Sequence, residues 1–117
     1  MRDKVNDPAR IQLMMDSIAN IEEFLLGVES YESFESNKIL CHAVIYNLQC
    51  IGESVYMLSK DYKDTHQGMD WEAIEGLRHV LVHDYYQVNM ATIWGIIQQD
   101  LQPLKTFLSS ECFVPRD

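Results

Sequence analysis

The sequence predicts an all-α protein, a four- to five-helix up-and-down bundle formed by a single domain over residues 1–117. Apolar residues recur at intervals of three and four along most of the chain, which is the spacing that lines one face of a helix. An apolar composition of 47% is enough for one hydrophobic core in a chain of this length. No alternating strand pattern, internal repeat or linker competes with the helices.

The first predicted helix covers residues 9–29, and the apolar run of the second extends from residue 40 to residue 58. A polar stretch at residues 30–36 separates them, and Ser36 is the expected N-cap of the second helix. Gly52 lies in the middle of the second helix, where it lowers helix propensity, so we expect another backbone to pack closely against it. The two inward faces consist of Ile11, Met14, Ile18, Ile21, Leu25 and Val28, and of Leu40, Val44, Asn47 or Leu48, Ile51, Val55 and Leu58.

The second half of the chain is predicted to contain a loop and two further helices. Residues 60–70 lack helical periodicity and contain several turn-forming residues, so they are expected to form the loop. Asp70 is the expected N-cap of a helix over residues 71–83, and Asn89 caps a last helix that Pro103 should kink or divide. The inward-facing residues are Trp71, Ile74 and Leu77 or Leu81, followed by Ile93, Ile97, Leu101, Leu104 and Leu108.

Charge and composition exclude several classes of protein. A net charge of −9 repels polyanions and argues against a broad basic nucleic-acid-binding face, so any contact with RNA must be local. No apolar run reaches the roughly 18 to 20 residues that cross a bilayer, which predicts a cytoplasmic protein without a membrane partner. Cys41, Cys50 and Cys112 form no C-x-x-C pair and are interpreted as buried or incidental thiols. No glycine-rich phosphate loop is present, so no cofactor is expected.

The stretch GLRHVLVHDYYQV, residues 76–88, contains the pattern Arg-x-x-x-x-His-x-Tyr, formed by Arg78, His83 and Tyr85. On one helix the five-residue spacing places Arg78 and His83 about 140° apart, so a single copy makes a poor active site. Two such helices that met across a two-fold axis would bring an arginine and a histidine from each chain into one cleft.

Together with IGESV at residues 51–55, Trp71, Trp94 and DLQPL at residues 100–104, this stretch resembles the HepT-type toxins, which are small all-α members of the HEPN superfamily. The resemblance extends from the second helix to the last, with several landmarks in the same order. It implies a homodimeric, metal-independent ribonuclease, the toxin of a type VII toxin-antitoxin system. It also implies a partner, a MntA-type nucleotidyltransferase that acts as the antitoxin.

The resemblance assigns roles to the residues of the motif. It implies that Arg78 stabilises the anionic transition state and that His83 transfers protons. These roles agree with the residue types, because RNA carries its own 2′-hydroxyl nucleophile, imidazole titrates near neutral pH and guanidinium binds phosphate in a bidentate manner. The resemblance further implies that the partner enzyme adenylylates Tyr85, beside Tyr86, which would add bulk and negative charge to the RNA cleft.

Other interpretations of these residues stay open. His79 stands where many relatives carry Asn, and it either substitutes as a hydrogen-bonding group or weakens cleavage. His79 and His83 have a spacing that can hold Zn²⁺, but no third ligand is evident. Glu53 is either a residue that supports the cleft or a solvated or interface glutamate. Arg78 also fits an ordinary charge on the helix surface or at an interface, and His83 also fits a cation at a helix C-terminus.

A different class of function is the alternative to a toxin ribonuclease. The acidic surface also suits a non-catalytic helical partner, or substrate-binding subunit, of a minimal nucleotidyltransferase. A dimeric scaffold without chemistry is a third possibility.

Overall fold

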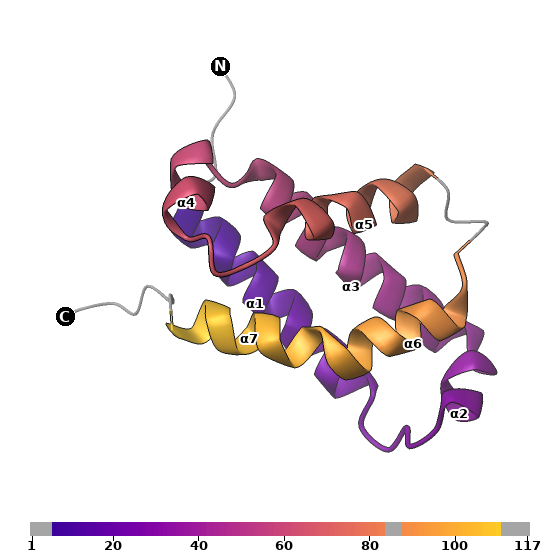
Figure 1. Cartoon of the computed structure of the whole chain (residues 1–117). Coiled ribbons are helices and arrows are strands. Elements are labelled where there is room, and N and C mark those ends of the chain that lie inside the picture. The colour runs from indigo at the N-terminus through magenta and orange to yellow at the C-terminus, as the bar shows by residue number, and fades with distance from the viewer. Residues whose placement is uncertain (1–5, 84–87, 111–117) are drawn as a thin grey trace.

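The computed structural model describes residues 6–83 and 88–110, and these residues form seven helices and no strand (Figure 1). The prediction of an all-α bundle is therefore confirmed. The longer helices are α1 (Asp7–Phe24), α3 (Lys38–Met57), α5 (Trp71–His83), α6 (Met90–Gln99) and α7 (Leu101–Ser110). Two short helices, α2 (Tyr31–Glu35) and α4 (Lys60–Thr65), lie in the connections.

Helix α3 lies at the centre of the bundle, and α1 and α5 both run antiparallel to it. At one end of the α1 and α3 pair, the backbone N–H of Ser59 donates to Asp7 at 2.9 Å. Further along the same pair, the Asn20 amide donates to Asn47 at 3.1 Å. Gln49 of α3 donates to the Leu81 carbonyl in the last turn of α5 at 2.8 Å, so the end of α5 is fastened to the middle of α3.

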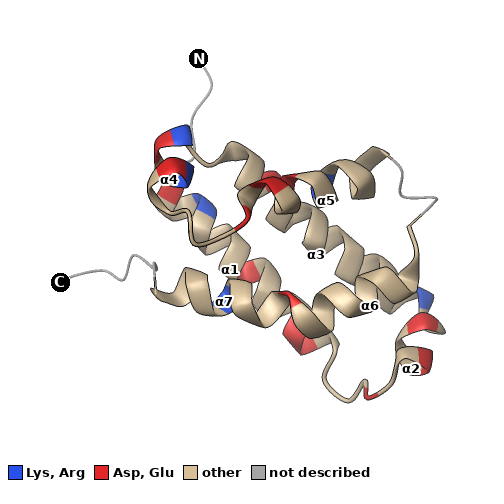
Figure 2. Ribbon diagram, viewed as in Figure 1, with Lys and Arg blue, Asp and Glu red and all other residues tan. Residues whose placement is uncertain are grey.

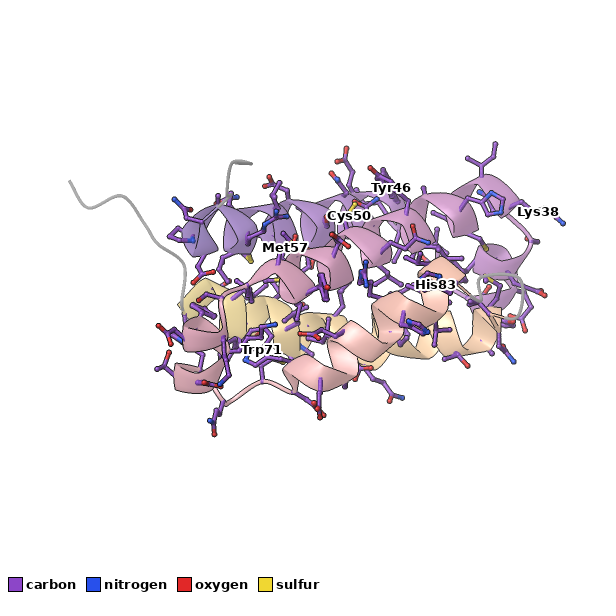
Figure 3. All side chains as sticks on the ribbon, turned by 90° about the horizontal axis from the view of Figure 1, so that it is seen from above. Lys38, Tyr46, Cys50, Met57, Trp71 and His83 are labelled. Carbon is purple, nitrogen blue, oxygen red and sulfur yellow. The ribbon has the colours of Figure 1, made fainter. Side chains whose placement is uncertain are left out.

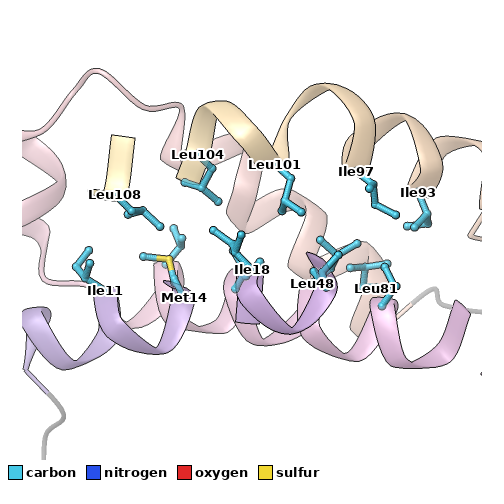
Figure 4. Close-up of a cluster of buried hydrophobic side chains, with 14 of the residues drawn as sticks. Ile11, Met14, Ile18, Leu48, Leu81, Ile93, Ile97, Leu101, Leu104 and Leu108 are labelled. Atoms are coloured by element: carbon cyan, nitrogen blue, oxygen red, sulfur yellow. The ribbon is translucent and has the colours of Figure 1, made fainter. Parts of the chain in front are cut away.

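The core lies between α1 and α3 on one side and α6 and α7 on the other, and Leu81 of α5 completes it (Figure 4). The periodic residues predicted to face inward are buried or pack against the core. Of the predicted inward residues on α5, Trp71 and Leu81 are buried, and Ile74 and Leu77 are partly buried. The largest side chains that are almost fully buried are Phe34, Ile11, Met14, Ile18, Ile21, Leu81, Ile93 and Leu108.

Three predicted helix boundaries in the second half of the chain are confirmed. The backbone N–H of Ala73 donates to Asp70 at 3.1 Å, and that of Ala91 donates to Asn89 at 2.7 Å, so both caps are in place. The last helix is divided at Asp100, between α6 and α7. Pro103 explains the division, because a continuous helix would need its nitrogen to donate to the Gln99 carbonyl, whereas a residue in the first turn of a new helix needs no such bond.

Two boundaries in the first half were predicted wrongly. The first helix ends at Phe24 rather than at residue 29, and the following turn places Gly27 at φ +83°, a left-handed conformation that glycine adopts without steric cost. The N-cap of α3 is Asn37 rather than Ser36, since the Asn37 side chain accepts from the backbone N–H of Leu40 at 3.1 Å. Ser36 instead ends α2.

The polar stretch 30–36 and the predicted loop 60–70 each contain a short helix that was not predicted. Five or six residues are too few to show a helical period, and both helices depend on a serine cap and one buried aromatic residue. In α2 the cap is Ser30 and the buried ring is that of Phe34, which packs on Trp94. In α4 the cap is Ser59, and Tyr62 packs against Trp71.

Among the helices described, none is long and apolar enough to span a membrane. Cys41 is buried, Cys50 is half-buried, and both carry free thiols, in agreement with their interpretation as incidental cysteines. Cys112 lies outside the described residues.

Candidate functional site

Helix α5 carries most of the predicted site residues. It begins at the Asp70 cap, and its last turn is fastened to α3 by the hydrogen bond from Gln49 to the Leu81 carbonyl. Arg78 lies in the middle of α5 and His83 at its end, where Figure 3 labels it. Tyr85, the predicted modification site, lies outside the described residues, as does Tyr86.

Arg78 points toward α3 and contacts two side chains there. Its Nε donates to Oε1 of Glu53 at 2.8 Å, and its guanidinium carbon lies 4.6 Å from the centre of the Tyr56 ring. The Arg78 side chain is 25% exposed and that of Glu53 is 48% exposed, so the pair lies at the surface. Among the residues that the structure describes, none accepts a hydrogen bond from the two terminal nitrogens of Arg78, which are therefore available to an anion.

Gly52 allows α5 to approach α3 this closely. A Cβ atom added to Gly52 would overlap the Cβ of Arg78 and lie 3.1 Å from its Cα. The close backbone approach predicted for Gly52 is therefore confirmed, and the residue that approaches is Arg78. Because Glu53 is the next residue along α3, the same crossing brings its carboxylate to the guanidinium.

His79 and His83 lie on the outward side of α5, and both are exposed. Their ring centres are 4.7 Å apart and the ring planes are inclined by 47°. Within the described part of the chain, no group of three or more His, Cys, Asp or Glu side chains is arranged to hold a metal ion. The five-residue spacing turns His83 about 140° away from Arg78 around the helix axis.

Exposed apolar side chains lie near Arg78 on both helices. Val82, one turn beyond Arg78 on α5, is 43% exposed, and Tyr56 and Met57 of α3 are 53% and 42% exposed. Single exposed apolar residues are ordinary, but a group of three beside a charged pair is typical of a surface that another molecule covers.

In the described part of the chain, lysine and arginine are not gathered into a basic face. Figure 2 shows lysine and arginine scattered over the helices, with acidic residues near most of them. Lys60 pairs with Asp64 at 2.8 Å, Lys63 with Glu75 at 2.7 Å and Lys105 with Glu22 at 3.0 Å. The prediction that any RNA contact must be local agrees with this distribution.

The structure brings some predicted residues together and leaves others apart. Arg78 and Glu53 form an ion pair, whereas His79 lies beside His83 rather than beside Arg78. Tyr56 and Gln49 were not predicted from the sequence. Tyr56 could have been found from the sequence, because it follows Glu53 by three residues and therefore lies on the same side of α3. For Gln49, whose partner is a backbone carbonyl of a distant helix, no local signal exists.

Comparisons with known proteins agree on one family. The ribonuclease HepT-like family matches residues 14–111. A Methanocaldococcus jannaschii protein whose name describes an RNase is 28% identical over 79% of this chain and 84% of its own length. A second such protein, from Caldanaerobacter subterraneus, is 34% identical over 65% of this chain and 68% of its own. "Probable ribonuclease HepT" of Thermococcus cleftensis is 31% identical over 77% of this chain and 81% of its own. No solved structure shows a significant match.

Proposed function

The chain belongs to the ribonuclease HepT-like family, and on that premise we propose that it is a metal-independent endoribonuclease with a composite active site at the interface of a homodimer. The main support is the environment of Arg78. Glu53 holds its Nε and Tyr56 covers one face of its guanidinium, while both terminal nitrogens are left for a phosphate group. An arginine fixed in this way suits the stabilisation of charge on a phosphate oxygen.

The proposed reaction is transesterification within RNA. The 2′-oxygen attacks the neighbouring phosphorus and loses its proton to one His83, forming the P–O2′ bond. The P–O5′ bond breaks, and the same imidazolium gives its proton to the departing 5′-oxygen. The products are a 2′,3′-cyclic phosphate and a 5′-hydroxyl end. Arg78 stabilises the negative charge that grows on the non-bridging oxygens, so no metal ion is needed.

A second copy of the chain supplies what one copy lacks. Arg78 and His83 point to different sides of α5, and His79 and Val82 lie between these two directions around the helix. A two-fold axis near His79 and Val82 would place Arg78 of each copy near His83 of the other. The exposed Val82 gives this side of α5 an apolar side chain for such a contact.

Regulation by a partner enzyme is the second part of the proposal. We infer that the chain is the toxin of a toxin-antitoxin pair, silenced when a MntA-like nucleotidyltransferase adenylylates Tyr85. Tyr85 follows His83 by two residues in the sequence, so a nucleotide attached to it would bring negative charge close to the RNA. Intact mass after co-expression with the neighbouring enzyme tests this step. No added nucleotide on Tyr85 contradicts it.

Cleavage of RNA by the purified chain in EDTA tests the activity directly. We expect the unaltered protein to cleave single-stranded RNA, and Arg78→Ala and His83→Ala each to reduce the rate at least about a hundredfold. Lys60→Ala is the matched control, because it removes a cation that is ion-paired on the distant helix α4. Intact RNA after incubation with the unaltered dimer, or equal rates for all variants, contradicts the proposal.

One observation favours a second candidate, a non-catalytic partner or substrate-binding subunit of a minimal nucleotidyltransferase. Arg78 is already neutralised by Glu53, in a chain of net charge −9. A stable complex with the enzyme, together with no cleavage of RNA by the free dimer, supports this candidate over the first.

A further inference from the structure

A groove crosses the surface next to the candidate site. It encloses about 480 Å³ between α1 and α3, and the end of α5 closes one side of it. We call it the α1–α3 groove, and the residues that matter here are Arg10, Ser17, Asn20, Tyr46, Asn47 and Glu53. Figure 3 shows Tyr46 and Cys50 in line along α3, and both residues line the groove.

The α1–α3 groove is continuous with the surroundings of Arg78. Glu53 lines the groove and also binds Arg78 at 2.8 Å. Val82, which also lines the groove, is one helical turn from Arg78 on α5. A chain bound at Arg78 would therefore enter this groove if it continued toward α1.

Arg10 has no anionic partner in the described residues. The structure describes six lysine and arginine side chains, and Lys60, Lys63, Arg78 and Lys105 each pair with a carboxylate. The other two, Arg10 and Lys38, do not. The Nε atom of Arg10 is buried and without an acceptor, although buried polar atoms normally have a partner. Because Arg10 lines the groove and has no carboxylate partner, its guanidinium is suited to binding an anion there.

The other lining residues suit a polar ligand with flat rings. Ser17 and Ser54 are buried polar residues, and Asn47 accepts from Asn20 at 3.1 Å. Tyr46 is 64% exposed, and its hydrogen bond with the Cys50 thiol raises the pKa of its phenol. The carboxylate of Asp16, on the rim, accepts from Gln12 at 2.9 Å.

We propose that the α1–α3 groove binds the single strand of RNA that flanks the cleaved phosphate, with Arg10 contacting a flanking phosphate and the Tyr46 ring stacking on a base. This inference rests on the proposed ribonuclease function. It places the substrate of each copy along α3, from Arg78 to the first turns of α1. Stacking on aromatic rings and contacts to the backbone phosphates are the usual means by which proteins bind single strands.

Binding and cleavage are measured separately. The ligand is a short single-stranded 2′-O-methyl RNA, which keeps the phosphates and bases but lacks the nucleophile. We expect Arg10→Gln to weaken its binding about tenfold and to reduce the slope of log Kd against log salt concentration by about 0.7. Tyr46→Ala should weaken it about tenfold with the slope unchanged. Arg10→Lys, which keeps the charge if Arg10→Gln disturbs folding, should stay within about threefold of the unaltered protein.

Lys38→Gln is the matched control. Lys38 is the other described cation without a carboxylate partner, so its replacement by glutamine changes the net charge by the same amount as Arg10→Gln. It lies at the far end of α3, away from Arg10 (Figure 3). Equal losses in Arg10→Gln and Lys38→Gln, or no loss in Arg10→Gln and Tyr46→Ala, overturn the inference. So does a loss of dimer in Arg10→Gln with unchanged RNA affinity, which would assign the groove to contact between copies. If one of these results is found but the unaltered protein still cleaves RNA, only the inference about the groove fails and the proposed ribonuclease activity stands. If the variants bind as expected but the unaltered protein does not cleave RNA, only the ribonuclease activity is refuted.

Discussion

The Arg78 side chain is held by contacts with two neighbours on α3. An arginine free in solvent loses conformational entropy when it binds a phosphate, and the contacts with Glu53 and Tyr56 remove part of that cost in advance. An exposed ion pair of this kind contributes only about 0 to 1 kcal/mol to folding. We therefore interpret the pair as a means of positioning the guanidinium.

Replacing Glu53 tests this interpretation. We expect Glu53→Gln to lower kcat for RNA cleavage about tenfold, to change KM less than about threefold, and to change the free energy of unfolding by less than about 1 kcal/mol. Asp64→Asn is the control, since it breaks the exposed ion pair of α4 in the same way. A kcat that is unchanged or higher in Glu53→Gln would show that Glu53 does not position Arg78 for the reaction.

The site residues differ in how well the sequence predicted them. The motif pointed to Arg78 and His83 because it is local, whereas Glu53, which follows the helix glycine Gly52, was expected either to support the cleft or to be a solvated or interface glutamate. The contacts of Arg78 with Tyr56 and of Gln49 with Leu81 depend on where α3 and α5 cross. A single sequence does not specify the register of that crossing, so these partners were found only in the structure.

At the scale of elements, the crossing of α3 and α5 is the feature on which the site depends. Gly52 gives α3 a surface without a side chain, and the Cβ and Cα atoms of Arg78 pack into that space. Gln49 fastens the next turn by its bond to Leu81. The distance of α5 from α3, and with it the position of Arg78 relative to Glu53, is therefore set by one glycine.

The substitution Gly52→Ala should separate the two helices. The added methyl group overlaps Arg78, so we expect the free energy of unfolding to fall by about 1 to 3 kcal/mol and RNA cleavage to fall with it. Gly95→Ala in α6 is the matched control, because a Cβ there meets nothing within 4 Å and alanine favours the helix by about 1 kcal/mol. Urea denaturation at one protein concentration measures both variants. Equal stability of the two would contradict the close packing.

The caps of α5 and α6 were predictable because each depends on one side chain beside a periodic segment. Asp70→Ala should lower the free energy of unfolding by about 1 kcal/mol, because the backbone N–H of Ala73 loses its acceptor. Thermal unfolding followed by circular dichroism measures this change, with Asp61→Ala, a first-turn residue of α4 that is not its cap, as the comparison. Equal unfolding temperatures for the two variants would show that the cap contributes nothing.

The short helices α2 and α4 were missed for a physical reason. Each is held by tertiary packing, Phe34 on Trp94 and Tyr62 on Trp71, rather than by its own propensity. The two tryptophans that supported the family resemblance thus anchor the connections of the bundle. They are structural residues of the fold, and the site on α5 is built on the frame that they hold.

At the scale of the whole molecule, one copy of the chain presents half of the proposed site. Its net charge of −9 gives RNA no general attraction, so binding must come from a few cations placed where the strand passes. In a homodimer the two copies of α5 would double those cations at the two-fold axis. The acidic remainder of the surface would then keep the dimer soluble and limit non-specific binding of nucleic acid.

Complementation between two inactive variants tests this account most directly. Arg78→Ala and His83→Ala chains, carrying different affinity tags, are co-expressed, and the mixed dimer is purified through both tags. If Arg78 of one copy acts with His83 of the other, the mixed dimer contains one intact pair, so it should recover about half of the unaltered cleavage rate while each parent dimer stays inactive. A mixed dimer as inactive as its parents would contradict a site shared between copies.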